Sequence, residues 1–217
     1  MNKDKQPTIK VMLVDDHAVV RAGYRFLLSY HQDIEIVAEA GDGEEALSLL
    51  DQHQPDILVV DLTMPGMHGL EVLRKARQRE QPPRVLVFTM HENTAFVEQA
   101  LYSGAEGYLS KNSAPETLVE AIRCIAAGKP YIDATIAQNM VVQQTREKGS
   151  LFEGLTNREF QILCLFAEGL GIDDIAARLK LSSKTIANYL TLIKDKLQTG
   201  STQELVRLAI SKGLVSL

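Results

Sequence analysis

The segment IKVMLVDD, residues 9–16, is a mostly apolar run that ends in two aspartates. Apolar runs of this length, separated by stretches with helical spacing, are typical of buried parallel strands. The pattern recurs in DILVVD (56–61), RVLVFT (84–89) and GYLSK (107–111). We therefore predict a parallel sheet whose strand ends carry Asp15, Asp16, Asp61, Thr89 and Lys111.

Five strand-like segments alternate with five amphipathic stretches as far as Gly128. The expected strands are 9–14, 34–39, 56–60, 84–88 and 106–109. The expected helices are 17–30, 43–53, 69–79, 93–103 and 114–127, and Ser113 with Glu116 has the spacing of a capping box for the last. Five βα units imply an α/β fold with a doubly wound parallel sheet of order 2-1-3-4-5.

The strand-end residues have the chemistry of a phosphoryl site, because ligands of such sheets bind outside the carboxyl ends of the strands. A carboxylate can take up a phosphoryl group, and Asp61, which ends the central strand, is the best nucleophile. Magnesium would neutralise the incoming charge, held by Asp15, Asp16 and the backbone carbonyl of Thr63. The phosphate oxygens would be bound by Thr89 and Lys111.

Each of these residues also has a simpler interpretation. Asp15 or Asp16 could cap the first helix, and Asp61 could be a turn aspartate. Thr89 could be a strand-end hydroxyl and Lys111 a solvated loop cation. The presence of all five in this order favours the phosphoryl site.

The motifs LVDDH, VVDLTMPGMHGLEVL, VFTMH and GYLSKNS resemble the receiver domain of two-component response regulators, over residues 8–128. The resemblance implies that Asp61 is the phospho-acceptor and that Asp15 and Asp16 bind Mg²⁺. It also implies that Thr89 and Lys111 bind the phosphate, and that Tyr108 is the switch aromatic. His68 departs from the pattern, since many receivers have Asp there.

Composition is that of a soluble globular protein, with 45% hydrophobic residues in 217. The N-terminal MNKDKQPT has no apolar core of a signal peptide, and we expect a cytoplasmic protein. Cys124 and Cys164 are far apart and are expected to be small buried residues in a reducing compartment. Residues 151–217 carry eight Lys/Arg and seven Asp/Glu, a net of +1, whereas the first 150 carry −6.

Residues 129–150 are expected to form a linker with a short helix around 136–142 and a polar stretch over 143–150. Residues 151–217 then show four helical patterns, an all-α domain. Thr156 and Glu159 predict a capping box at its start. In the third helix, 184–197, the apolar residues share one side and face the core, and they are Ile186, Leu190, Ile193 and Leu197.

The opposite side of that helix is polar with small residues, and lysines stand at its margins. Such a face fits a DNA major groove, because short side chains approach bases and lysines meet phosphates. The alternative is an ordinary surface helix of a helical bundle.

The segment LTNREFQILCLFAEGLGIDDIAARLKLSSKTIANYLTLIKDKL resembles the LuxR-type (NarL/FixJ) helix-turn-helix domain, over residues 151–213. The Tyr189 variant also resembles the Gac/UvrY-like regulators. The resemblance implies a dimer contact on the fourth helix and DNA contacts by Lys184, Thr185, Asn188, Thr191, Lys194 and Lys196. Tyr189, Leu192 and Ala187 depart from the usual residues, so fewer base-reading side chains are evident.

These features predict a non-enzymatic transcription factor, phosphorylated on Asp61 by a sensor histidine kinase and then pairing on double-stranded DNA. One rival is a phosphohydrolase of the haloacid-dehalogenase type, but that class needs a second carboxylate where this chain has Thr63. The other is a phosphorylation-controlled, protein-binding regulator whose helix-turn-helix does not bind DNA.

Overall fold

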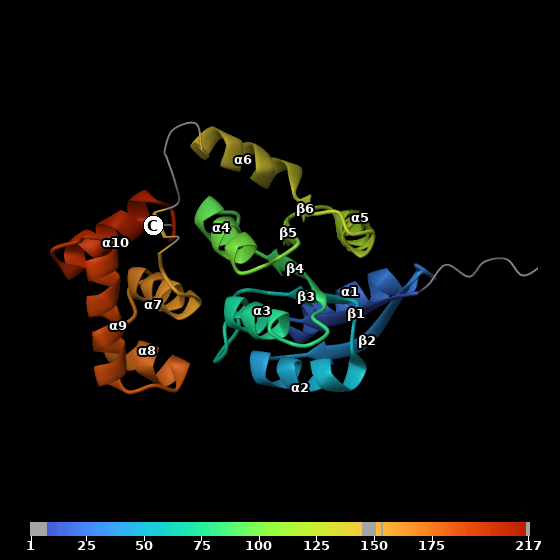
Figure 1. The fold of residues 1–217 in the computed structure, drawn as a ribbon, viewed down its shortest axis with the longest axis horizontal. Coiled ribbons are helices and arrows are strands. Elements are labelled where there is room, and N and C mark those ends of the chain that lie inside the picture. The colour runs from blue at the N-terminus through green and yellow to red at the C-terminus, as the bar shows by residue number, and fades with distance from the viewer. Residues whose placement is uncertain (1–7, 145–150, 153, 216–217) are drawn as a thin grey trace, which may run out of the picture. The chain divides into compact units, whose positions relative to one another are not determined.

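The computed structural model describes residues 8–144, 151–152 and 154–215 (Figure 1). Contacts divide the chain into two compact units. One comprises Met1–Met90 and Ser103–Asp133, and the other comprises His91–Tyr102 and Ala134–Leu217. The polar stretch predicted over 143–150 falls mostly outside the described residues. Within those residues, the helices lack the length and apolarity that a membrane crossing requires.

The first unit is built on a parallel sheet of order β2-β1-β3-β4-β5-β6. Its strands are β1 (Ile9–Val14), β2 (Ile34–Ala40), β3 (Ile57–Val60), β4 (Arg84–Thr89), β5 (Gly107–Ser110) and β6 (Tyr131–Ile132). The predicted fold class and the order of the five strands are confirmed. The sixth strand was not predicted, because two residues show no periodicity. It is held by the N–H groups of Tyr131 and Asp133, which donate to Glu106 and Tyr108 at 3.1 and 3.0 Å.

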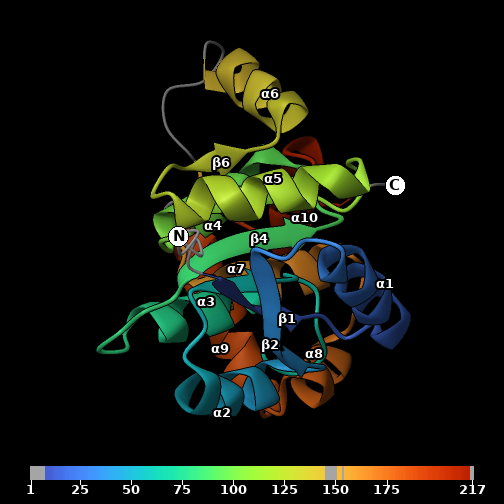
Figure 2. The same ribbon diagram turned by 90° about the vertical axis from the view of Figure 1, so that its right-hand side faces the viewer.

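Four helices of this unit cover the sheet (Figure 2). They are α1 (Ala18–Ser29), α2 (Gly43–His53), α3 (Gly69–Arg77) and α5 (Pro115–Ala126). Helices α1 and α5 share one core with the strands, in which Leu28 and Ile122 pack with Val59. Helices α2 and α3 pack on each other. The chain passes from β2 over β1 to β3, so the strand order reverses between β1 and β3, and ligands of such sheets bind at the carboxyl ends of these strands.

The predicted capping box at the start of α5 is wrong. The N-cap is Ala114, which makes no side-chain cap. The hydroxyl of Ser113 instead donates to Asp133 Oδ2 at 2.5 Å, just after β6. A long-range partner has replaced the local one.

The second unit is all-helical. Its helices are α4 (Thr94–Tyr102), α6 (Ala134–Gln144), α7 (Asn157–Ala167), α8 (Ile172–Leu179), α9 (Ser183–Lys196) and α10 (Thr202–Ser211). The predicted Thr156–Glu159 capping box is present: the Glu159 N–H donates to Thr156 Oγ1 at 3.3 Å, and the Thr156 N–H donates to Glu159 Oε2 at 2.7 Å. Cys164 is buried, which raises the pKa of its thiol, whereas Cys124 of the first unit is only half-buried.

Helix α4 belongs to this unit through contacts made by three residues in it or just before it. The ring of Phe96 meets Phe160 edge-on at 5.1 Å. Gln99 Nε2 donates to the Phe152 carbonyl at 2.5 Å. Asn93, just before α4, donates to the carbonyls of Lys212 and Gly213 at 3.0 and 2.9 Å. Helix α4 and the residue before it therefore contact both the chain that precedes α7 and the chain that follows α10.

Candidate functional site

Carboxylates meet at the ends of the neighbouring strands β1 and β3. Asp15 follows β1 and Asp61 follows β3, and these residues are only 6% and 4% exposed. The Asp61 N–H donates to the Val14 carbonyl at 2.9 Å, which keeps the two strand ends together. Ligand atoms of Asp15, Asp16, His17 and Asp61 all lie within 4.8 Å of one another. The structure therefore gathers the three carboxylates that the sequence placed at this edge.

Lys111 neutralises this cluster from the end of β5. Its Nζ lies 2.5 Å from Asp15 Oδ2 and 2.6 Å from Asp61 Oδ2, and the side chain is 8% exposed. Burial alone would lower the pKa of Lys111, but the hydrogen bonds that its ammonium donates to Asp15 and Asp61 outweigh this effect, so the pKa is raised. The ammonium therefore stays charged between two carboxylates.

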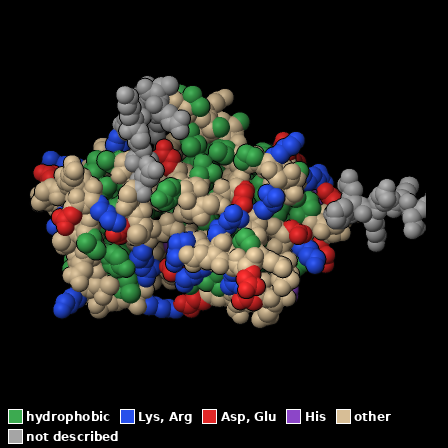
Figure 3. Space-filling model, in the orientation of Figure 1, with side chains coloured by type: hydrophobic (Ala, Val, Ile, Leu, Met, Phe, Trp, Pro, Cys, Tyr) green, Lys and Arg blue, Asp and Glu red, His purple; other side chains and the backbone are tan. Residues whose placement is uncertain are grey.

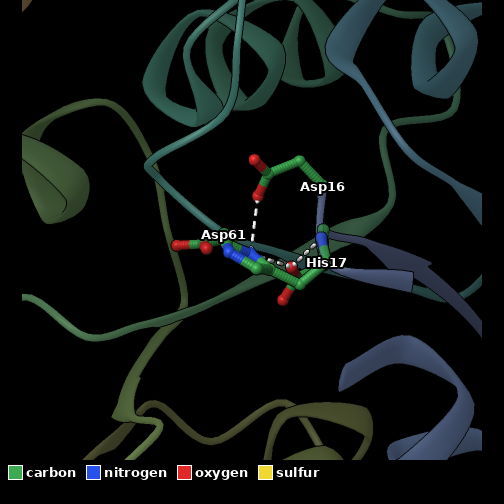
Figure 4. A group of neighbouring side chains, drawn as sticks. Asp16, His17 and Asp61 are labelled. Carbon is green, nitrogen blue, oxygen red and sulfur yellow. Dashed lines mark hydrogen bonds and ion pairs between the residues drawn. The ribbon is translucent and has the colours of Figure 1, made fainter. Parts of the chain in front are cut away.

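Asp16 carries an oxygen without a hydrogen-bond donor. The side chains of Asp16, His17 and Asp61 come together in Figure 4, and His17 Nδ1 lies 2.9 Å from Asp16 Oδ1. That contact lacks hydrogen-bond geometry, and Asp16 Oδ1 is buried without a donor among the described residues. A buried carboxylate oxygen with free lone pairs suits a hard cation, which prefers oxygen ligands. The cluster thus fits a divalent ion such as Mg²⁺.

The simpler interpretations of the aspartates are partly resolved. The N-cap of α1 is His17, which makes no side-chain cap, so neither Asp15 nor Asp16 caps that helix. Asp61 does behave as a turn aspartate, since its Oδ1 accepts from the Thr63 N–H at 3.3 Å. This bond leaves the other oxygen, Oδ2, to Lys111.

Thr89 and Tyr108 are fully buried on adjacent strands. Thr89 ends β4 and is paired in register with Ser110 of β5, and its carbonyl accepts from the Lys111 N–H at 2.9 Å. Tyr108 lies two residues before Ser110, paired with Val87. The backbone therefore links Thr89 directly to the lysine of the acidic cluster.

The other predicted face lies on α9, which begins after its cap Ser182. Ile186, Leu190 and Ile193 are buried, as the periodicity predicted. Lys184, Asn188 and Thr191 are exposed, whereas Thr185 and Lys194 are half-buried. The backbone N–H of Thr185 is engaged in the cap of the helix, since it donates to Ser182 Oγ.

Lys196, also predicted on this face, is engaged elsewhere. Its Nζ lies 2.6 Å from Glu159 Oε2, in the capping box of α7. Burial of Glu159 would raise its pKa, but the hydrogen bonds from Lys196 and Thr156 outweigh this and lower it. A phosphate contact by Lys196 would therefore require this ion pair to open.

Comparison with known proteins identifies both regions. Residues 11–123 match the response regulator receiver domain, and residues 153–209 match the luxR family of bacterial regulatory proteins. This chain belongs to the LuxR-type response regulators. They are a family of transcriptional regulators.

Relatives of this response regulator span its whole length. It is 41% identical to the transcriptional activator protein ExaE of Pseudomonas putida, over 94% of this chain and 97% of the other. It is 37% identical to the response regulator UvrY of Escherichia coli, over 95% of each chain. The structure of RcsB from Salmonella typhimurium superposes with a TM-score of 0.73 at 25% identity, over 95% of this chain and 99% of that one. A complex of RcsB with DNA superposes with a TM-score of 0.61 at 26% identity, over 94% and 98%.

Two residues at the acidic cluster of this response regulator were not predicted from the sequence, His17 within it and Gly69 beside it. His17 joins it because α1 starts there, and its N–H donates to Asp15 Oδ1 at 2.8 Å. Gly69 begins α3 against the backbone of Asp61, where any Cβ would overlap the Asp61 carbonyl. The helix approaches the strand end this closely only with glycine. The adjacent His–Gly pair 68–69 was the available signal, and it was seen only as a departure from the pattern.

Charge on the C-terminal helices of this regulator is mixed. Figure 3 shows Lys and Arg interspersed with Asp and Glu over these helices, on the left of the view. This agrees with a net charge of +1 over residues 151–217. Any attraction to DNA must therefore come from individual lysines rather than from a broad basic surface.

Proposed function

We propose that the regulator is switched by a phosphoryl group on Asp61, donated by the phosphohistidine of a sensor kinase. A carboxylate oxygen of Asp61 forms the new P–O bond while the P–N bond of the donor breaks, and the leaving imidazole takes up a proton. The observation that carries this proposal is the buried Asp61 carboxylate lying 2.6 Å from the Lys111 ammonium. Lys111 is positioned to hold a phosphate oxygen as the negative charge arrives.

A divalent cation belongs to the same proposal. Mg²⁺ supplies neutralisation of the phosphate charge when it is bound. Asp15, Asp16, Asp61 and the Thr63 carbonyl would hold it, and the free Asp16 Oδ1 supports this. Lys111 would then leave Asp15, which it bonds here, to face the phosphate.

Phosphorylation would be sensed by Thr89, and Tyr108 would be the buried aromatic side chain that moves in response. Phosphate adds acceptor oxygens that attract the Thr89 hydroxyl and Lys111. Helix α4 begins five residues after Thr89 and contacts the C-terminal helices through Phe96 and Gln99. A shift at the end of β4 would therefore change the position of α4, which belongs to the second unit, and so pass the signal to that unit.

The output we propose is sequence-specific binding of double-stranded DNA by two copies, in the cytoplasm. The exposed Asn188 and Thr191 of α9 would meet bases, and the lysines Lys184, Lys194 and Lys196 would meet phosphates, with Thr185 at the helix start. The dimeric pairing would use α10, and the DNA-bound relative RcsB supports a DNA target. We do not expect turnover of an external substrate, because Thr63 replaces the carboxylate that a phosphohydrolase requires.

Asp61→Asn tests the site. The full chain, incubated with acetyl phosphate and Mg²⁺, should gain the mass of one phosphoryl group, and the Asp61→Asn variant should gain none. Asp51→Asn is the matched control, because the Asp51 side chain is 72% exposed and pairs with Arg79 at the surface. Persistent labelling of Asp61→Asn would refute the assignment.

DNA binding is tested separately with the chain held in the beryllofluoride form. Affinity for mixed duplex should fall steeply as salt rises, because counterions are released from phosphates. Failure to bind any duplex at low salt would favour the rival, a regulator that binds protein instead.

A further inference from the structure

The middle turns of α9, residues 185–193, carry no charged side chain. The helix contains no arginine, the side chain most often used to read guanine. Four of its exposed positions form two rows at i, i+4 spacing, Ala187 with Thr191 and Asn188 with Leu192, and the exposed Lys184, Asp195 and Lys196 lie at the ends of these rows. Leu192 is 49% exposed, an apolar side chain next to Asn188. The middle of the face that would enter the groove therefore carries one amide beside apolar groups, with charged residues only at its two ends.

Thr191 adds to this apolar character. Its hydroxyl donates to the Ala187 carbonyl at 3.1 Å, one turn earlier in the helix. The donor of the side chain is thus consumed within α9. The γ-methyl of Thr191 takes no part in this bond, and both Thr191 and Ala187, one turn apart, are exposed. The sequence predicts Thr191 only as a DNA contact, and this bond favours its methyl over its hydroxyl as the group that meets a base.

We propose that Ala187 and Thr191 read thymine through its 5-methyl group, while Asn188 reads a neighbouring adenine. This rests on the proposed DNA-binding function and adds the base composition that α9 selects. Thymine alone presents a methyl in the major groove, and alanine and the threonine methyl are its usual apolar contacts. Asparagine bonds adenine N6 and N7 as a pair. The half-site beneath the first turns of α9 is therefore made of A·T pairs.

The lysines agree with this assignment of roles. Lys184 stands one turn before Asn188, and Lys194 is half-buried at the far margin. Each can meet a phosphate, or in the case of Lys184 a flanking guanine, without displacing the apolar centre.

The experiment begins by selecting tight sites from a random duplex pool with the full chain in its beryllofluoride form. Each thymine of the selected half-site is then replaced by deoxyuridine, which removes only the methyl. We expect one or two replacements to weaken binding about fourfold each, the effect of losing one buried methyl. Thr191→Ser keeps the hydroxyl but lacks the methyl. It should bind the thymine site about fourfold more weakly, and should no longer distinguish uracil from thymine at its position.

Thr8→Ser is the control, because Thr8 is exposed just before β1, in the first unit and outside the helices proposed to bind DNA or pair. It should keep the full thymine–uracil difference. Selected half-sites with G·C pairs at the centre, or equal binding of thymine and uracil sites by the wild type, would overturn this inference while leaving DNA binding intact. Recovery of no bound duplex would instead overturn the proposed function itself.

Discussion

Replacing Lys111 by methionine tests how much the charge of Lys111 stabilises the two carboxylates of the acidic cluster. Lys111 is 8% exposed and lies within 2.6 Å of Asp15 and Asp61, whose side chains are 9% and 5% exposed. Methionine keeps much of the volume and removes the charge. Two buried carboxylates are then left facing each other without a cation.

The cost follows from the spacing of the carboxylates. Their oxygen atoms lie within 4.8 Å of each other. At an effective dielectric constant of about 20, two like charges at that distance repel by about 3.5 kcal/mol. Removing one partner of a buried pair costs about 3–5 kcal/mol. We therefore expect Lys111→Met to lower the free energy of unfolding by about 3 kcal/mol in EDTA. Millimolar Mg²⁺ should restore most of the lost free energy of unfolding, because the cation replaces the lost ammonium.

The measurement is urea unfolding followed by circular dichroism, since the chain contains no tryptophan. Wild type and variant are compared in EDTA and in Mg²⁺. Lys75→Met is the control: Lys75 is 37% exposed and pairs with Glu71 one turn away, so its loss should cost about 0.5 kcal/mol or less. A Lys111→Met loss no larger than that of the control, or one unaffected by Mg²⁺, would refute the reasoning.

Two further variants probe the supports of the two sites. Gly69→Ala should lower the free energy of unfolding by about 1–3 kcal/mol and impair phosphoryl uptake, because its Cβ overlaps the Asp61 carbonyl; normal stability and labelling would show that α3 shifts freely. Glu159→Gln should cost about 1–2 kcal/mol at neutral pH, since Lys196 loses its charged acceptor. The pKa of Glu159 is lowered below its ordinary 4.5 in the folded state, so its contribution exists above that pH and is lost as pH falls below it. The difference from wild type in urea should therefore shrink as the pH falls below 4.5, and a constant difference would contradict this expectation.

Short-range sequence patterns were sufficient to predict most of the helices and strands. Apolar runs located five strands, and the bounds of α2, Gly43–His53, were predicted to the residue. The Thr156–Glu159 box formed because both partners lie within one helical turn. Features of this kind depend on neighbours three or four residues apart, so a single segment contains the whole cause.

The sequence by itself determined which residues end the strands, and the rule for open sheets then placed them at one edge. Only the tertiary structure decided how they pair. Lys111 meets Asp15 across 96 positions of the chain, and the Ser113 hydroxyl bonds Asp133 rather than capping the helix that follows it. Each outcome is a competition between partners, and the winner depends on distances that packing sets after the local elements have formed.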